Sequence, residues 1–130
     1  MAEVLGSVAA SLQLLKIVRR SWELYHELDD VSNSTKRTRS MIDGLDATLR
    51  LVQECSISFL PTAALRAENI VQAILSELQT IQTLIPPDEK LNNVLRKARW
   101  LREKTVVNKG FLEIERLKSE LHLLLDASSM

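Results

Sequence analysis

The first 28 residues carry an apolar pattern that only a few folds can accommodate. Apolar residues recur there at intervals of three, four and seven, which predicts a long helix with one face directed at a core. These residues are Leu5, Val8, Leu12, Leu15, Trp22 and Tyr25. The other side of the helix is apolar as well, with Val4, Ala9, Leu14, Ile17 and Val18 beside a thin polar strip. A helix that is apolar nearly all round lies at the centre of a bundle or contacts lipid, and the pattern permits both.

Small residues recur four apart at Ala2, Gly6 and Ala10, so that they stack on one face of this helix. Such spacing lets a second helix approach closely in membranes, and it is also tolerated in tightly packed bundles. A permanent transmembrane span is not expected, because the run Val4–Val18 is shorter than the about 20 residues that a bilayer requires and contains Lys16. A signal peptide is not expected either, since no basic segment precedes the apolar run and no cleavage site follows it.

Residues that form turns are scarce in this chain, with three glycines and three prolines among 130 residues. Leu, Ala, Glu, Lys and Arg dominate, and the aromatic residues are two Trp, one Tyr and two Phe. This composition favours helices over strands. The length suits one hydrophobic core, so we expect a single all-α domain over residues 1–130.

The second helix is expected to begin with Ser32 or Ser34 as its cap. It should end at a break over residues 55–61, where β-branched and hydroxyl residues lead into a proline. Its core positions are Met41, Ile42, Leu45, Leu49 and Val52. Gly44 lies among them, and we interpret it as a site of close helix contact.

The third helix is expected over residues 63–84, with Thr62 as its cap. Pro86 and Pro87 should stop it, because neither can donate a backbone hydrogen bond and the first disfavours helix at the residue before it. The core positions of this helix are Leu65, Ile70, Val71, Ile74, Leu78, Ile81 and Ile85.

The last third of the chain predicts two helical segments. Asp88 should cap the first of them, residues 89–104, whose core positions are Leu91, Val94, Leu95, Ala98 and Leu101. Residues 105–110 combine β-branched residues with Asn and Gly, which predicts a kink or a short break. The second segment should end near Asp126, with Phe111, Ile114, Leu117, Leu121 and Leu124 in the core.

Helices of about 20 residues span about 30 Å, and short connections oblige successive helices to run antiparallel. The sequence therefore predicts an up-and-down bundle of four long helices with a short or bent extra helix. The segment 89–104 is either that separate short helix or the first half of a bent last one.

The charges and glycines exclude several classes of function. Seventeen basic and seventeen acidic residues cancel, so no overall field favours nucleic acid or a membrane. A phosphate-binding loop needs several glycines close together, whereas Gly6, Gly44 and Gly110 are each isolated, and we expect no cofactor. His26 and His122 have no neighbouring metal ligands at a suitable spacing, so no metal site is expected.

Cys55 is the single cysteine, which fits a reducing cytosol. No candidate base lies near it in the sequence, although the fold could bring it close to His26 or His122. We predict a non-enzymatic protein with no catalytic residues.

A basic run lies between residues 96 and 104, where five of nine residues are cationic. The cations are Arg96, Lys97, Arg99, Arg102 and Lys104. A solvated helix face is one interpretation. Trp100 favours another, because the helical spacing points it away from Leu91 and the core, among these cations. A tryptophan ringed by cations suits an interfacial patch against a membrane or a partner protein, unless a local bend turns it inward.

Three segments, residues 1–11, 99–104 and 112–125, resemble the HeLo-like group, the fungal amino-terminal domains of STAND receptors. The resemblance covers nearly the whole chain. It implies a helical bundle related to the killer domain of mixed-lineage-kinase-like pseudokinases, placed ahead of a nucleotide-binding oligomerisation module. In that setting the bundle is a cytoplasmic effector of programmed cell death in fungal innate immunity and heterokaryon incompatibility. It stays inactive until oligomerisation releases its first helix to insert into a membrane.

The resemblance also implies which residues and partners matter. The membrane-active helix would use Ala2, Leu5, Gly6, Val8, Ala10, Leu12 and Leu15, with one glycine where the family has a glycine-rich motif. The expected partners are further copies of the chain, anionic lipids on activation and a downstream nucleotide-binding module, but no nucleic acid. The alternative function is a protein-protein assembly domain of a receptor with no membrane activity.

Overall fold

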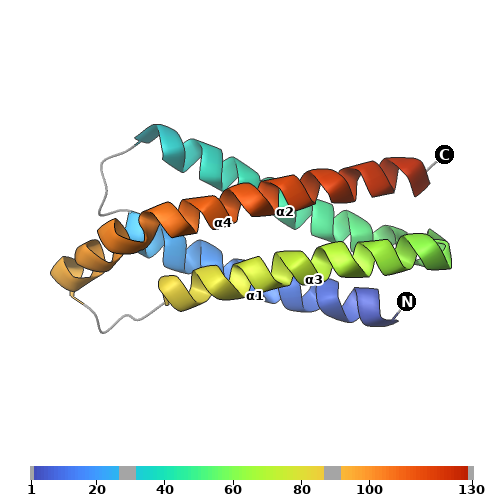
Figure 1. The fold of residues 1–130 in the computed structure, drawn as a ribbon, viewed down its shortest axis with the longest axis horizontal. Coiled ribbons are helices and arrows are strands. Elements are labelled where there is room, and N and C mark those ends of the chain that lie inside the picture. Colours follow the sequence, from blue (N-terminus) through green and yellow to red (C-terminus); the bar gives the residue numbers. More distant parts are fainter. Residues whose placement is uncertain (1, 27–31, 87–91, 129–130) are drawn as a thin grey trace.

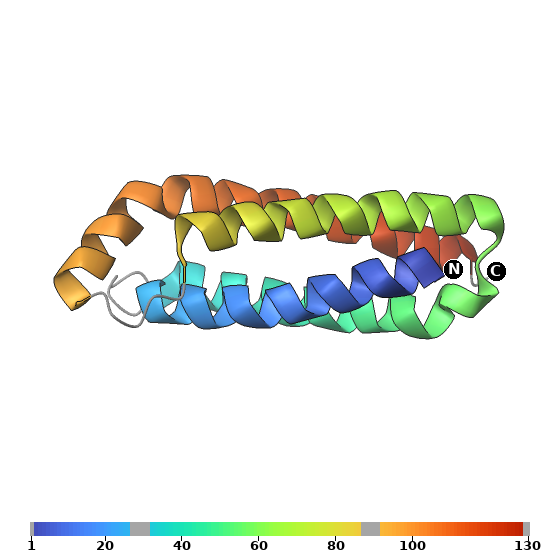
Figure 2. The ribbon, with the colours of Figure 1, turned by 90° about the horizontal axis from the view of Figure 1, so that it is seen from below.

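The structure, a computed structural model, describes residues 2–26, 32–86 and 92–128. Its helices are α1 (Ala2–His26), α2 (Ser32–Cys55), α3 (Pro61–Leu84) and α4 (Asn93–Ser128), with a 3-10 turn, η1 (Ser56–Ser58), between α2 and α3. Each long helix runs antiparallel to the one before it (Figure 1), and both chain ends lie at the same end of the bundle (Figure 2). No strand occurs in the described ranges. The predicted all-α bundle of four long helices is confirmed.

The core takes side chains from all four long helices. Every position predicted as core in α2 is buried, and so is every one predicted in the second half of α4. These residues are Met41, Ile42, Leu45, Leu49, Val52, Phe111, Ile114, Leu117, Leu121 and Leu124. The prediction succeeds there because apolar residues lie on one side of these segments and charged ones on the other.

The buried face of α1 is rotated from the predicted one. Leu5 was expected in the core but is 38% exposed, whereas Val4 and Val18 were placed on the other side and are buried. The buried positions alternate in steps of four and three, as Val4, Val8, Ser11, Leu15, Val18, Trp22 and Tyr25, and Leu12 is buried beside that series. Ser11 belongs to this series although it is polar, and counting it as a surface residue hid the true register.

The third helix differs from the prediction at its first turn. It begins at Pro61, with Leu60 at the cap position, so the expected cap Thr62 lies inside the helix. Leu65 was expected in the core but is exposed, and Ile70 is only partly buried. Ala64 and Ala67 are buried instead, and their small side chains leave room for α1 to pack closely. The helix ends at Leu84, before Pro86, as predicted.

The break predicted at residues 105–110 is absent, because α4 continues through it as one helix of 36 residues. Val107 and Gly110 are buried within it. A Cβ atom added at Gly110 would lie 3.1 Å from Cδ1 of Ile81. Gly110 is therefore a site where α3 and α4 approach closely. Packing against α3 keeps this part of α4 helical, although residues 105–110 have low helix propensity.

The first turns of α4 bend toward the other helices (Figure 2), so residues 93–104 are the first part of a bent last helix. The predicted core stripe of this part is wrong: Val94, Leu95, Ala98 and Leu101 are exposed. The expected positions of Leu91 and Asp88 lie outside the described residues, as do the side chains of Ser32 and Ser34.

Gly44 does contact α4, through one side chain. A Cβ atom at Gly44 would lie 3.0 Å from Nζ of Lys118, whose side chain crosses α2 at this point and is only 15% exposed. The prediction of close helix contact is thus met by a lysine that occupies the space a larger residue would fill.

Candidate functional site

The structure divides the predicted membrane-active residues of α1 between the core and the surface. Val8, Leu12 and Leu15 are buried, whereas Leu5, Gly6 and Ala10 are exposed. Ala2 lies in α1, but its side chain is outside the described part of the chain. At rest the helix is therefore an integral part of the bundle.

Polar contacts hold α1 to α3 near the start of both helices. The hydroxyl of Ser7 donates a hydrogen bond to Oε1 of Glu68 at 2.7 Å, and Nε2 of Gln72 donates to the same hydroxyl at 2.7 Å. At the far end of α1, the Tyr25 hydroxyl donates to the carbonyl oxygen of Pro86 at 3.0 Å. An ion pair between Arg19 and Asp43 joins α1 to α2.

The basic run does not surround an exposed tryptophan. Trp100 was expected on the exterior but is 4% exposed. It lies in one buried series with Val107, Ile114 and Leu121, spaced by seven residues. The continuous helix carries the buried face of its second half back to Trp100, which is why the separate register assumed for residues 89–104 failed.

The five cations of the basic run differ in their exposure to solvent. Lys97 and Arg102 are exposed, and Arg96, Arg99 and Lys104 are partly buried. Nε of Arg102 lies 3.0 Å from Oε1 of Glu103. The other four aromatic side chains, Trp22, Tyr25, Phe59 and Phe111, are buried as well, so the surface has no aromatic residue with which to enter a membrane interface.

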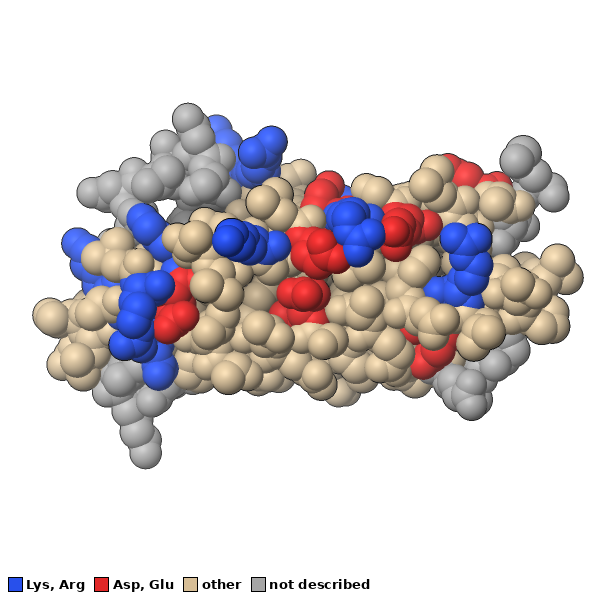
Figure 3. All heavy atoms as spheres, viewed as in Figure 1, with Lys and Arg blue, Asp and Glu red and all other residues tan. Residues whose placement is uncertain are grey.

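One side of the bundle is almost free of charge. From Asn69 to Thr83, every exposed residue of α3 is uncharged, and so is every exposed residue of α1 from Leu5 to Gln13. Figure 3 shows this as a largely uncharged lower region where α3 lies, below a row of charges along α4. We call this surface the uncharged face: Gly6, Ala10, Gln13 and Ile17 of α1 with Asn69, Gln72, Ser76, Gln79, Thr80 and Thr83 of α3.

The outer surface of α4, next to this face in Figure 3, carries an ionic cluster. The guanidinium of Arg116 donates hydrogen bonds to Glu113 and, at 2.7 Å, to Glu120. The hydrogen bond from Arg116 is the main cause that lowers the pKa of Glu113, and the same contact raises the pKa of Arg116. These groups are exposed, so the cluster stabilises the helix only slightly.

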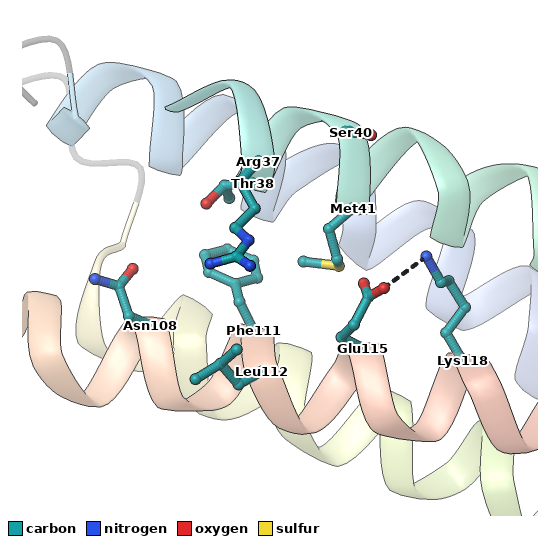
Figure 4. Close-up of a pocket in the computed structure, with 9 residues that line it drawn as sticks. All are labelled: Arg37, Thr38, Ser40, Met41, Asn108, Phe111, Leu112, Glu115 and Lys118. Carbon is teal, nitrogen blue, oxygen red and sulfur yellow. Dashed lines mark ion pairs between the residues drawn. The ribbon is translucent and has the colours of Figure 1, made fainter. Parts of the chain in front are cut away.

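A groove of about 510 Å³ separates α2 from α4. Arg37, Met41 and Phe111 point toward one another across it (Figure 4). Lys118 lies at one end, with its Nζ 3.2 Å from Oε1 of Glu115. Asn108 and Leu112 of α4 complete the side that faces solvent. The groove therefore has an apolar base, formed by Met41 and Phe111, with Arg37 toward one end and Lys118 at the other.

His122 and Cys55 do not meet in a nucleophile and base pair. The Thr48 hydroxyl donates to the carbonyl oxygen of Gly44 at 2.8 Å, and Nε2 of His122 lies 2.9 Å from that hydroxyl oxygen. Because Thr48 has a single proton to donate, His122 is the donor in the second contact. Cys55 is a half-buried free thiol at the end of α2, and the side chain of His26 is outside the described residues.

Within residues 2–26, 32–86 and 92–128, no group of three or more His, Cys, Asp or Glu side chains could hold a metal ion. In the same ranges, none of the helices has the length and hydropathy needed to cross a membrane. Comparison of the chain with protein-family models, with curated proteins and with solved structures finds no match.

Proposed function

We propose that this chain is a non-enzymatic assembly domain that associates with copies of itself through the uncharged face. The observation that supports the proposal is the distribution of charge. Charged residues make up 26% of the sequence, yet none of the eleven exposed residues between Leu5 and Gln13 of α1 and between Asn69 and Thr83 of α3 is charged. Depletion of charge is typical of the central part of a protein-protein interface.

The chemistry of the face suits a protein partner better than lipid. Asn69, Ser76 and Gln79 are exposed and offer amide and hydroxyl groups that another protein can satisfy by hydrogen bonding. The hydrocarbon of a bilayer cannot satisfy them, and each unsatisfied group would cost energy there.

The same face is compatible with a second copy of itself. A two-fold contact places one patch against the identical patch, so that a charged patch would repel itself. The α2 and α4 surfaces carry such charges, for example Arg39 and Arg116, whereas the uncharged face brings no like charges together.

Introducing charge tests this proposal. The double variant Ser76→Lys and Gln79→Lys should lower self-association, measured by analytical ultracentrifugation over a range of concentrations. The matched control, Ser119→Lys and Gln53→Lys, places the same changes at exposed positions of α4 and α2 and should associate like the wild type. A wild-type chain that stays monomeric at every concentration would contradict the proposal.

The second candidate function is the membrane-targeting effector of programmed cell death that the HeLo-like resemblance implies. The observation that favours it is the exposed apolar side of α1, where Leu5, Ala9 and Ile17 face outward. Release of α1 would add Val8, Leu12 and Leu15 to this surface.

Liposome leakage separates the two candidates. The purified chain, fused to a tag that forces it to oligomerise, is mixed with vesicles that contain anionic lipids. An effector should bind and permeabilise them, and the triple variant Arg96→Glu, Lys97→Glu and Lys104→Glu should reduce that binding. An assembly domain should leave the vesicles intact while it still associates with itself.

A further inference from the structure

The first turns of α4 expose an apolar stripe with the spacing of a coiled coil. Its residues alternate in steps of four and three, and all are exposed: Val94, Ala98, Leu101, Thr105, Asn108 and Leu112. We call this stripe the α4 seam. Val94 is 78% exposed and Leu112 66%, so no part of the bundle covers either end of it.

Basic residues flank the seam on both sides. Lys97 and Lys104 occupy the positions beside it on one side, and Arg102 and Lys109 those on the other. In a coiled coil these flanking positions choose the partner by charge. Lys97, Arg102 and Lys109 are exposed, although Arg102 also pairs with Glu103.

The end of the seam leads into the groove between α2 and α4. Asn108 and Leu112 belong to both, and Arg37 stands on the α2 side of the groove (Figure 4). Arg37 therefore extends the row of cations alongside the apolar stripe. The seam spans about 27 Å, calculated from a rise of about 1.5 Å per residue.

We infer that the α4 seam binds a helix of a partner protein, one with apolar residues at heptad spacing and acidic residues on both sides of them. Charge complementarity selects this occupant. A second copy of the same seam would bring Lys97 and Arg102 against identical cations, which like-charge repulsion opposes. A lipid surface fits less well, because the seam contains Thr105 and Asn108 and no aromatic residue.

This inference rests on the proposed function as an assembly domain and adds a second kind of partner to it. The uncharged face tolerates a copy of itself, whereas the α4 seam repels one. The domain would therefore associate with itself through one surface and recruit a different, acidic helix through the other.

Two designed peptides test the inference. Both are helical, with leucine at the heptad core positions, and carry either glutamate or lysine at every flanking position. Fluorescence anisotropy with the whole chain, below the concentration at which it self-associates, should show binding of the acidic peptide that weakens as salt rises. The basic peptide should bind at least about tenfold more weakly.

Substitutions in the α4 seam test whether the peptide binds at this surface. Leu101→Asp with Leu112→Asp should weaken the acidic peptide about tenfold or more. The matched control, Ile57→Asp with Leu65→Asp, changes two exposed apolar residues outside the seam and should bind like the wild type. The triple variant Lys97→Glu, Arg102→Glu and Lys109→Glu should reverse the preference, so that it binds the basic peptide more tightly than the acidic one.

Three results would overturn the inference: equal affinity for the two peptides, no effect of the seam variant, or no reversal in the triple variant. Anionic vesicles that bind the wild type but not the seam variant, while the acidic peptide fails to bind, would assign the seam to lipid instead. Self-association without peptide binding would refute only the inference. Peptide binding by a chain that stays monomeric would refute only the proposed assembly through the uncharged face.

Discussion

Trp100 decides which side of α4 faces the core in the first part of that helix. Its ring is buried, whereas its neighbour Leu101 is half exposed. Truncating a buried tryptophan removes many contacts and leaves a cavity, while an exposed leucine loses little.

Trp100→Ala should therefore lower the free energy of unfolding by about 3–5 kcal/mol. Leu101→Ala, as the control next to it, should change stability by less than about 1 kcal/mol. Urea unfolding followed by circular dichroism measures both. Equal losses for the two variants would show that the helix face is assigned wrongly.

The glycines of α1 and α4 differ in the space around them. Nothing lies within 4 Å of a Cβ atom built at Gly6, whereas one at Gly110 would lie 3.1 Å from two carbon atoms of Ile81. Gly6→Ala should stabilise the chain by about 0.5–1 kcal/mol, because alanine loses less backbone freedom on folding. Gly110→Val should destabilise it by about 1–3 kcal/mol through overpacking. Thermal unfolding of the two variants checks this, and a stabilising Gly110→Val would contradict the close approach of α3 and α4.

The sequence predicted where most of the helices lie, but in α1 and in the first part of α4 it did not predict which side of the helix is buried. Met41, Leu45 and Leu49 lie between charged residues, so their side of α2 was unambiguous. In α1 both sides are apolar, and local periodicity could not choose between Val4 and Leu5. The buried side includes two serines, Ser7 and Ser11, and Ser7 hydrogen-bonds to Glu68 of α3, a tertiary contact that no local pattern contains.

The candidate surfaces were less predictable, for a related reason. The basic run at residues 96–104 was evident from the sequence, but Trp100 was predicted to be the exposed apolar residue within it, whereas Trp100 is buried and Leu101 is exposed. Local propensity favours a break at residues 105–110, but Val107 and Gly110 pack into the bundle, and this packing keeps the segment helical. The uncharged face joins residues of α1 and α3 that are about 60 positions apart in the chain, so only the fold brings them together.

Burial of α1 gives the helix a measurable contribution to stability. Leu12→Ala and Leu15→Ala should each cost roughly 2–5 kcal/mol, because both side chains are buried between helices. Leu5→Ala is the control on the exposed side and should cost much less. Chemical denaturation measures the three variants, and losses under about 1 kcal/mol at Leu12 and Leu15 would mean that α1 is detached at rest.

The ionic cluster on α4 should give a small dependence of stability on pH. The lowered pKa of Glu113 in the folded chain means that its pairing with Arg116 stabilises the fold above the ordinary carboxyl pKa, and that this contribution is lost as the pH falls through the lowered value. The melting temperature of Glu113→Gln should therefore lie slightly below that of the wild type at neutral pH. The two should converge in acid and at high salt, and a difference that grew in acid would rule out this origin.

As a whole, the molecule is held by one core to which every long helix contributes. Unfolding should accordingly be a single cooperative transition. Variants with one tryptophan, Trp22→Phe and Trp100→Phe, report on α4 and α1 respectively, and their fluorescence midpoints should coincide with the loss of helix by circular dichroism. An earlier transition at Trp22 than at Trp100 would reveal that α1 leaves the bundle first.

Both ends of the chain lie at one end of the bundle, while the α4 seam begins at the other (Figure 2). Copies gathered by their chain ends would consequently present their seams outward, at the periphery of the cluster. A partner that carries several acidic helices could then engage several seams at once, and its residence time would rise through effective concentration without any new contact. Clustering alone would convert a weak single-site interaction into a durable one.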